Sequence, residues 1–230
     1  MCFLRLGRIK QNAFFSILIL LFIALMQGEI LAECQGGIDG NGVTKTERRA
    51  VTDFSRIHIT GAFDVEINSG NQYSLSITAD ENILPIIKSV VTGQTLDIRS
   101  TDSYCTQNVL YLEIGTENLR GLHLSGATDI NVAGVDSDVF DIRLEVAGDL
   151  RIEGTAGKVN AELKGGSDLD AIELKAQEVS VTITGAGDAG VHASDMLEAE
   201  ITGMGDIVYY GRPKIIRKNI TGLGDIEEGY

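Results

Sequence analysis

The chain of 230 residues has no tryptophan, only two prolines and few basic side chains. Without tryptophan, it lacks the aromatic platform on which a sugar-cleaving enzyme could stack a sugar ring. Since there is no proline-rich linker, one domain is expected after the N-terminal leader. Its 19 lysines and arginines are outnumbered by 33 aspartates and glutamates, which gives a net charge of −14. This acidic balance argues against nucleic acid and anionic membrane surfaces as partners.

The N-terminal apolar stretch is too short to cross a bilayer comfortably. It covers residues 13–26, whereas a membrane-spanning helix needs about 20 apolar residues. Basic residues precede it and acidic residues follow it, as in a secretory signal peptide. We therefore predict a signal peptide over residues 1–33 and a mature domain over residues 34–230. Export would place the protein in the periplasm, on the outer-membrane surface or outside the cell.

Two of the three cysteines, Cys34 and Cys105, remain in the predicted mature chain. An even number of cysteines in an exported protein favours a disulfide, and two separate thiols are the alternative. Residues 31–34 also resemble a bacterial lipobox, although Glu33 stands where a small residue is expected. Lipidation of Cys34 and an uncleaved N-terminal anchor therefore stay open. Only these two alternatives would bring the protein into contact with a membrane.

The chain does contain a repeated motif. In each copy, a segment of alternating apolar and polar residues is followed by Gly, then Asp, then a second alternating segment. The Asp of successive copies stands at positions 129, 149, 168, 188, 206 and 225, so the copies are 18–20 residues apart. Such a period is typical of solenoids, in which each unit buries its apolar edge against its neighbours. Apolar residues at every second position, such as Val179, Val181 and Ile183, predict strands with one buried face. The predicted fold is all-β, a single-domain parallel β-helix of about 19 residues per coil, with an up-and-down β-sandwich as the alternative.

The predicted domain has two parts. Residues 34–115 hold N-terminal strands interrupted by a short helical turn at 80–88, capped by Asp80. Residues 116–230 hold the regular Gly–Asp coils, and Ile172 and Leu174 are the predicted inward pair of one of them. A sharp corner in every coil calls for φ > 0, which glycine adopts without a Cβ penalty. The predicted corner glycines are Gly126, Gly148, Gly165, Gly185, Gly203 and Gly222.

Taken in order, these segments resemble the head domain of auto-transporter adhesins, the GIN domain family. The resemblance rests on V-x-x-F-x-x-I-x-I-x-G-A-F-D-V-x-I at 51–67, I-T-A-D-E-N-I-L-P at 77–85 and G-x-T-L-x-I at 93–98. It closes with the Gly-x-Gly-Asp copies and Y-Y-G-R-P at 209–213, and it covers about residues 47–228. The resemblance implies a right-handed parallel β-helix exported to the bacterial envelope, with no established enzymatic activity.

The repeated aspartates form the first candidate site. Asp188, Asp206 and Asp225 would stack in a column about 5 Å apart, where like charges repel unless something compensates. Calcium binds carboxylate oxygens and is one candidate. Backbone N–H groups are the simpler candidate, because each coil has only one Gly–Asp corner. We therefore expect no metal and no cofactor.

No catalytic constellation stands out in the sequence. His58, His123 and His192 alternate with apolar neighbours, so we predict that all three face solvent, without ligands at metal-binding spacing. The even spacing after residue 120 leaves no room for the long loops on which β-helix enzymes build their sites.

The sequence thus predicts a non-catalytic binding or structural module of the cell envelope, not an enzyme. Its binding surface would be a flat, acidic strand face with outward side chains such as Thr184, Thr202 and Thr221. The partner is unknown: a glycan, an envelope protein and self-association through exposed strand edges all fit. A periplasmic scaffold and a degenerate carbohydrate-active enzyme are the alternatives.

Overall fold

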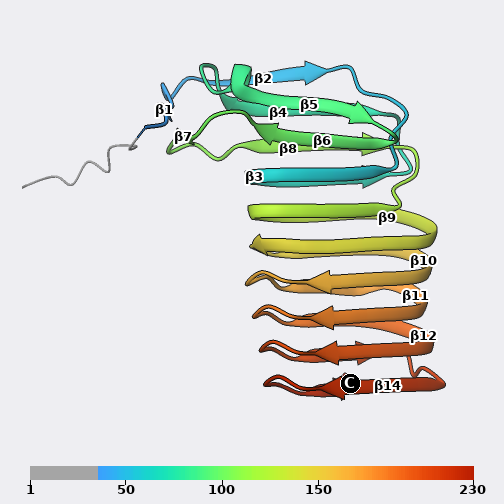
Figure 1. Ribbon diagram of the computed structural model, residues 1–230. Coiled ribbons are helices and arrows are strands. Elements are labelled where there is room, and N and C mark those ends of the chain that lie inside the picture. The colour runs from blue at the N-terminus through green and yellow to red at the C-terminus, as the bar shows by residue number, and fades with distance from the viewer. Residues whose placement is uncertain (1–35) are drawn as a thin grey trace, which may run out of the picture. The chain divides into compact units, whose positions relative to one another are not determined.

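Strands fill most of the chain and stack along a single axis (Figure 1). The computed structural model describes residues 36–230, so the predicted signal peptide and Cys34 lie outside the described residues. Within 36–230 there is no α-helix, only a 3-10 turn at Leu84–Ile86, and the all-β prediction is confirmed. No helix in this part of the chain is long and apolar enough to span a membrane.

Thirteen strands form one mostly parallel sheet, and a separate parallel pair joins β1 (Ile38–Asp39) to β7 (Tyr104–Cys105). In chain order, the strands of the large sheet are β2 (Thr44–Arg49), β3 (Arg56–Ser69), β4 (Ser74–Asp80), β5 (Ile87–Thr92), β6 (Thr95–Ser100), β8 (Tyr111–Thr116), β9 (Gly121–Ala147), β10 (Leu150–Leu163), β11 (Leu169–Ile183), β12 (Ala189–Ile201), β13 (Ile207–Tyr210), β14 (Ile215–Ile220) and β15 (Ile226–Glu228). The antiparallel pairs are β2–β4, β4–β8 and β5–β6.

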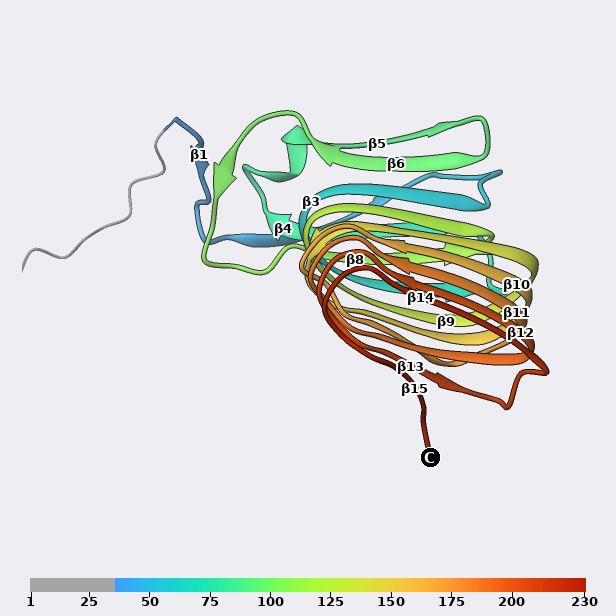
Figure 2. The ribbon, with the colours of Figure 1, turned by 60° about the horizontal axis from the view of Figure 1, so that its bottom comes forward.

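From β9 to β13, consecutive strands pair in parallel, while β14 pairs with β12 and β15 pairs with β13. We call each layer of this stack a rung. Figure 2 shows the rungs nested over one another. The register places like residues in columns: Leu163 of β10 pairs with Leu144 of β9 and with Ile183 of β11. All three side chains are buried, as is Ile201 of the next rung. Stacked aliphatic columns of this kind, buried on one side of every strand, form the core.

One predicted inward residue is placed differently. In β11, Ala171 and Leu174 are buried, and Ile172 is partly exposed. The register between β11 and β12 shifts between Ala171 and Lys175, because the strand carries an irregularity there. A bulge inserts an unpaired residue and reverses the alternation that follows, so the prediction that Ile172 points inward is wrong.

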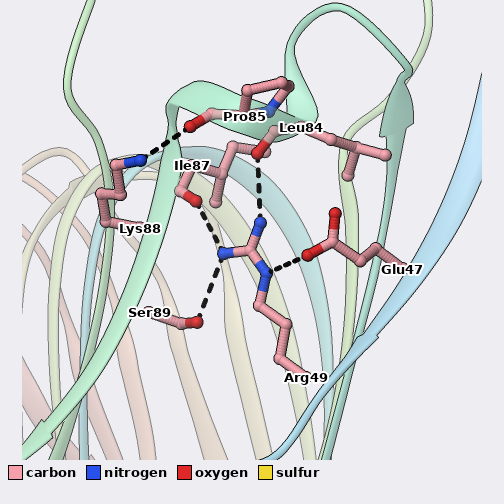
Figure 3. Close-up of polar contacts among 7 residues, drawn as sticks. All are labelled: Glu47, Arg49, Leu84, Pro85, Ile87, Lys88 and Ser89. Atoms are coloured by element: carbon pink, nitrogen blue, oxygen red, sulfur yellow. Dashed lines mark hydrogen bonds and ion pairs between the residues drawn. The ribbon is translucent and has the colours of Figure 1, made fainter.

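The antiparallel strands lie at the N-terminal end of the stack (Figure 1). Arg49 of β2 holds the 3-10 turn there (Figure 3). Its guanidinium donates to the backbone oxygen of Leu84 at 3.1 Å and to that of Ile87 at 2.6 Å. The Nε atom donates to Glu47 at 2.8 Å. The oxygen of Leu84 also accepts the backbone N–H of Ile87 at the end of the turn, so Arg49 adds a second donor to it.

Asp80 does not cap this turn through its side chain, contrary to the prediction. Residue 83 is the N-cap position and has no side-chain cap bond. The buried Asp80 carboxylate instead accepts hydrogen bonds from Asn108, Thr106 and the N–H of Gly42. The Asn108 bond is the main reason that the pKa of Asp80 lies below its usual value. Asp80 thus joins three loop segments of the N-terminal end.

The corner glycines have two different causes. Gly126 and Gly148 have φ of 121° and 152°, in the region that favours glycine. The predicted φ > 0 is wrong for the other four, Gly165, Gly185, Gly203 and Gly222. At Gly203 the cause is space, since an added Cβ would lie 1.9 Å from the backbone oxygen of Gly185 in the preceding rung. The preceding rung therefore occupies the space where a side chain would be.

Replacing Gly203 by alanine tests this explanation. We expect Gly203→Ala to cost about 1–3 kcal/mol, the usual range for overpacking, which lowers Tm by roughly 2–12 °C. Gly166→Ala is the matched control, because its Cβ would lie 3.6 Å from the oxygen of Ala186. The control should stay within about 0.5 kcal/mol of the parent. Thermal unfolding followed by circular dichroism measures both, and equal melting temperatures for the two variants would contradict the explanation.

Candidate functional site

The outward side chains of successive rungs stand in columns, since parallel paired residues lie over one another at about 4.8 Å. One outward column consists of Asp141, Asn160, Ser180, Glu198 and Arg217. The neighbouring column consists of Arg143, Glu162, Thr182, Glu200 and Asn219. Side chains from several rungs can therefore contact one ligand.

A groove of about 630 Å³ lies over the N-terminal part of these columns. Gly121 lies in its wall between Arg56 and Asp141, where an added Cβ would lie 3.1 Å from the backbone oxygen of Asp141, 3.4 Å from its Cβ and 3.7 Å from Cγ of Arg56. The Arg56 guanidinium lies 3.8 Å from the Asp141 carboxylate. The polar side chains that line the groove are Arg56, His58, Thr95, His123, Asp141, Arg143, Asn160, Glu162, Ser180 and Thr182.

His58 and His123 stack on each other in this groove. Their ring centroids are 4.5 Å apart and the rings are tilted by 13°. His58 Nδ1 lies 3.0 Å from Asp97 Oδ2. Nε2 of His123 is shielded from solvent and makes no hydrogen bond, and it lies 3.8 Å from Glu145 Oε2. Desolvation, followed by the nearby His58, lowers the pKa of His123, which is therefore neutral at pH 7.

The predicted solvent exposure of the histidines is only partly right. The side chains of His58 and His123 are 32% and 37% exposed, so both are half-buried. His192 is half-buried too, and desolvation lowers its pKa. His58 and His123 are far apart in the sequence but form one stacked pair. His192 lies on β12 and does not line the groove.

The groove is not uniformly acidic. Asp141 accepts a hydrogen bond from Asn160 at 2.9 Å, and Glu162 pairs with Lys164 at 3.0 Å. Arg143 is exposed, and within residues 36–230 its guanidinium forms neither a hydrogen bond nor an ion pair. Its donors are therefore available to a ligand.

The predicted outward threonines Thr184, Thr202 and Thr221 are all exposed in successive rungs. Their hydroxyls are partly engaged. Thr184 donates to the oxygen of Leu163 at 3.3 Å, and Thr202 donates to that of Ile183 at 3.4 Å. These threonines therefore support the corner and have less capacity for a partner than the groove has.

A second hollow, of about 760 Å³, lies beside β4 and β8. Arg49 lines it, but the bonds of that guanidinium to backbone oxygens are already made (Figure 3). Arg48 also lines this hollow, is exposed and makes no side-chain hydrogen bond or ion pair within residues 36–230, so a free arginine does not separate the two hollows. We consider the groove with Arg143 the stronger candidate because it also holds the stacked histidine pair.

The repeated aspartates form a ladder along the corners. Asp188 Oδ1 accepts from the backbone N–H of Asp206 at 2.7 Å, and Asp206 Oδ1 accepts from that of Asp225 at 2.8 Å. The same bond links Asp168 to Asp188 and Asp129 to Asp149. Four carboxylates, those of Asp129, Asp168, Asp188 and Asp206, thus accept the backbone N–H of the next rung, whereas no such bond joins Asp149 to Asp168. Within residues 36–230, no three His, Cys, Asp or Glu residues are grouped as metal ligands.

Substitutions at Asp206 test whether N–H groups or calcium stabilise this ladder. Asp206→Ala removes the acceptor for the Asp225 N–H and should cost about 1 kcal/mol. Asp206→Asn keeps an accepting oxygen and should cost less. If the N–H account is right, Tm of the parent protein is the same in millimolar calcium and in EDTA. A Tm that rises with calcium and no longer does so in the Asp206→Ala variant would establish the calcium site instead.

Cys105 is disulfide-bonded. Cys34 lies outside the described residues, so the Cys34–Cys105 pairing stays a prediction.

The histidine pair escaped the sequence analysis, although a signal for it exists. Residues 56–65 read R-I-H-I-T-G-A-F-D-V, and residues 121–130 read G-L-H-L-S-G-A-T-D-I. The structure pairs these segments in parallel, with His58 opposite His123. Aligning the first strand with the later copies would have placed the two histidines in one column.

A family model described as "Putative auto-transporter adhesin, head GIN domain" matches residues 53–213. The chain belongs to this family. The resemblance inferred from the sequence is thereby confirmed, and the groove lies within the matched part of the GIN domain. Among curated proteins, none matches the chain.

Solved structures share the fold of this GIN domain. A putative adhesin from Bacteroides fragilis NCTC 9343 is 24% identical with a TM-score of 0.71, over 84% of this chain and 100% of that one. A putative adhesin from Parabacteroides distasonis ATCC 8503 is 20% identical with a TM-score of 0.53, over 84% and 99%. A putative lipid binding protein from the same strain is 22% identical with a TM-score of 0.52, over 84% and 99%. At these identities the likeness extends to the fold alone.

Proposed function

We propose that the protein is an exported, non-catalytic, adhesin-like binding module of the bacterial cell envelope, which holds its partner in the groove. One observation carries this proposal. The groove joins side chains with unused hydrogen-bonding capacity, Arg143 and His123, to neutral hydroxyl and amide groups on paired strands. A rigid backbone holds these groups in place before the partner arrives, which lowers the entropic cost of binding.

The scaffold of this module is a right-handed parallel β-helix with about 19 residues per coil. Leu150 pairs with Ile130 and with Leu169, and Leu169 pairs with Ala189, which supports a coil of this size. The right hand is the one that parallel strand connections take in nearly all proteins. Other members of the family would share this scaffold and differ in outward side chains.

Export rests on the predicted signal peptide over residues 1–33, which leaves residues 34–230 as the mature domain. The family description and the net charge of −14 agree with an envelope protein kept soluble by its charge. Protease added to intact cells tests the location. Digestion before permeabilisation supports display on the surface, and protection until permeabilisation favours the periplasmic scaffold.

The state of the acidic side chains favours binding over catalysis. Asp141 and Glu162, the two carboxylates of the groove, are engaged by Asn160 and Lys164. Glycosidase chemistry needs two carboxylates on opposite sides of the scissile bond, one of them protonated. Because a neighbouring side chain already holds each carboxylate, the arrangement supports a surface that recognises a ligand and leaves it intact.

A bulky side chain placed in the groove tests the proposal. We expect Thr182→Arg to weaken binding to cells and to an array of neutral and acidic oligosaccharides by at least about tenfold, or 1.4 kcal/mol. Thr155→Arg is the control, because Thr155 is an outward threonine of β10 that does not line the groove. The control should bind like the parent. Equal binding by both variants and the parent would show that the partner is held elsewhere.

A further inference from the structure

We propose that the groove selects saccharides that carry a carboxylate, which Arg143 and His123 bind beside Gly121. This inference rests on the proposed function, because it names the ligand class of the same groove. It comes from the distribution of charge and of unused donors along the groove.

Four side chains that are or can become cationic line the groove, in a chain whose net charge is −14. Three of them already have an acidic neighbour: Arg56 lies 3.8 Å from Asp141, His58 lies 3.0 Å from Asp97, and His123 lies 3.8 Å from Glu145. Within residues 36–230, Arg143 has no acidic partner and Nε2 of His123 makes no hydrogen bond, so this end of the groove can take up a further negative charge.

Arg143 is suited to a carboxylate in particular. Its planar guanidinium offers parallel N–H donors that match the two oxygens of a carboxylate. Nε2 of His123 is shielded from solvent, and its 3.8 Å distance to Glu145 is too long for a hydrogen bond. A ligand oxygen beside it would supply the missing partner, which removes the cost of a buried polar atom without a hydrogen bond.

The opposite end of the groove is suited to sugar hydroxyls. Asn160, Ser180 and Thr182 come from two successive rungs and add neutral donors and acceptors to the lining. A bare anion would leave these groups unused, whereas a saccharide uses both ends. The neutral groups at this end of the groove are what favour a saccharide as the carrier of the carboxylate, because sugar hydroxyls can pair with them.

The charged groups around His123 predict the effect of pH on binding. His58 of β3 stacks on it and is paired with Asp97 of β6. Arg143 and Glu145 act on it from β9, and Lys164, the residue after β10, pairs with Glu145. A bound carboxylate favours the protonated imidazole, so binding takes up a proton. Affinity should therefore rise as the pH falls from 8 to 5.5. Carboxyl groups ordinarily titrate near pH 4, below this range.

The test is calorimetric titration of the purified protein with an oligosaccharide of galacturonic acid. The matched ligand is the same oligosaccharide with its carboxylates reduced to alcohols. We expect the acidic form to bind, and Arg143→Gln or reduction of the ligand to weaken binding about tenfold or more. Arg151→Gln is the control: it removes the same charge from an exposed arginine, paired with Asp170, outside the groove. It should leave affinity unchanged.

A second pair of variants measures the pH effect. His123→Gln should reduce the gain in affinity between pH 8 and pH 5.5. His192→Gln, at a half-buried histidine outside the groove lining, should keep that gain. Equal pH dependence in the parent and in His123→Gln would overturn the role of His123.

The remaining outcomes separate this inference from the proposed function. If both forms of the oligosaccharide bind equally and Thr182→Arg blocks both, the groove binds glycans but the carboxylate assignment is wrong. Equal losses of affinity in Arg143→Gln and Arg151→Gln would show that the effect comes from the overall charge of the protein. That result would also overturn the carboxylate assignment. If phosphatidylglycerol vesicles bind through Arg143 and the oligosaccharide does not, the ligand is a lipid headgroup. If Thr182→Arg blocks no ligand, both proposals fail.

Discussion

The spacing between rungs, about 4.8 Å and set by backbone hydrogen bonds between parallel strands, governs the rest of this structure. The N–H of Thr202 donates to the oxygen of Ile183 at 2.9 Å, and the N–H of Thr221 donates to that of Ile201 at the same distance. At the corners this spacing leaves no room for a Cβ at Gly203, which is why glycine recurs there. It also brings most of the corner aspartates within reach of the next backbone N–H, so that a column of like charges is tolerated.

The same spacing separates stability from recognition. Inward residues such as Leu163 and Ile183 pack in columns and fix the register. Outward residues follow that register but do not contribute to the core, and so they can change without altering the scaffold. The groove lies over the outward columns of successive rungs, where Arg143 and His123 keep unused hydrogen-bonding capacity. We regard this groove, and not the flat threonine column, as the functional part of the surface.

The period of the Gly–Asp copies was enough to predict the strands, most of the core residues and the pairing of one copy with the next. What it could not predict depends on neighbours in space. Ile172 points away from the core because of a local bulge, and the carboxylate of Asp80 bonds Asn108 and not the turn that follows it. The conformation of Gly203 depends on how closely the preceding rung approaches. The stacking of His58 on His123 could have been found by aligning β3 with the repeats, since their sequences are alike.

The most direct test of the account is chemical-shift mapping by NMR of the purified protein, titrated with the galacturonic acid oligosaccharide. The account predicts amide shift changes confined to the groove: residues 56–58, 121–123, 141–143, 160–162 and 180–182, with little change in β13 and β15. Such a pattern would place the ligand across successive rungs on one outward face. Changes centred on other faces of the stack, or no changes at saturating ligand, would contradict it.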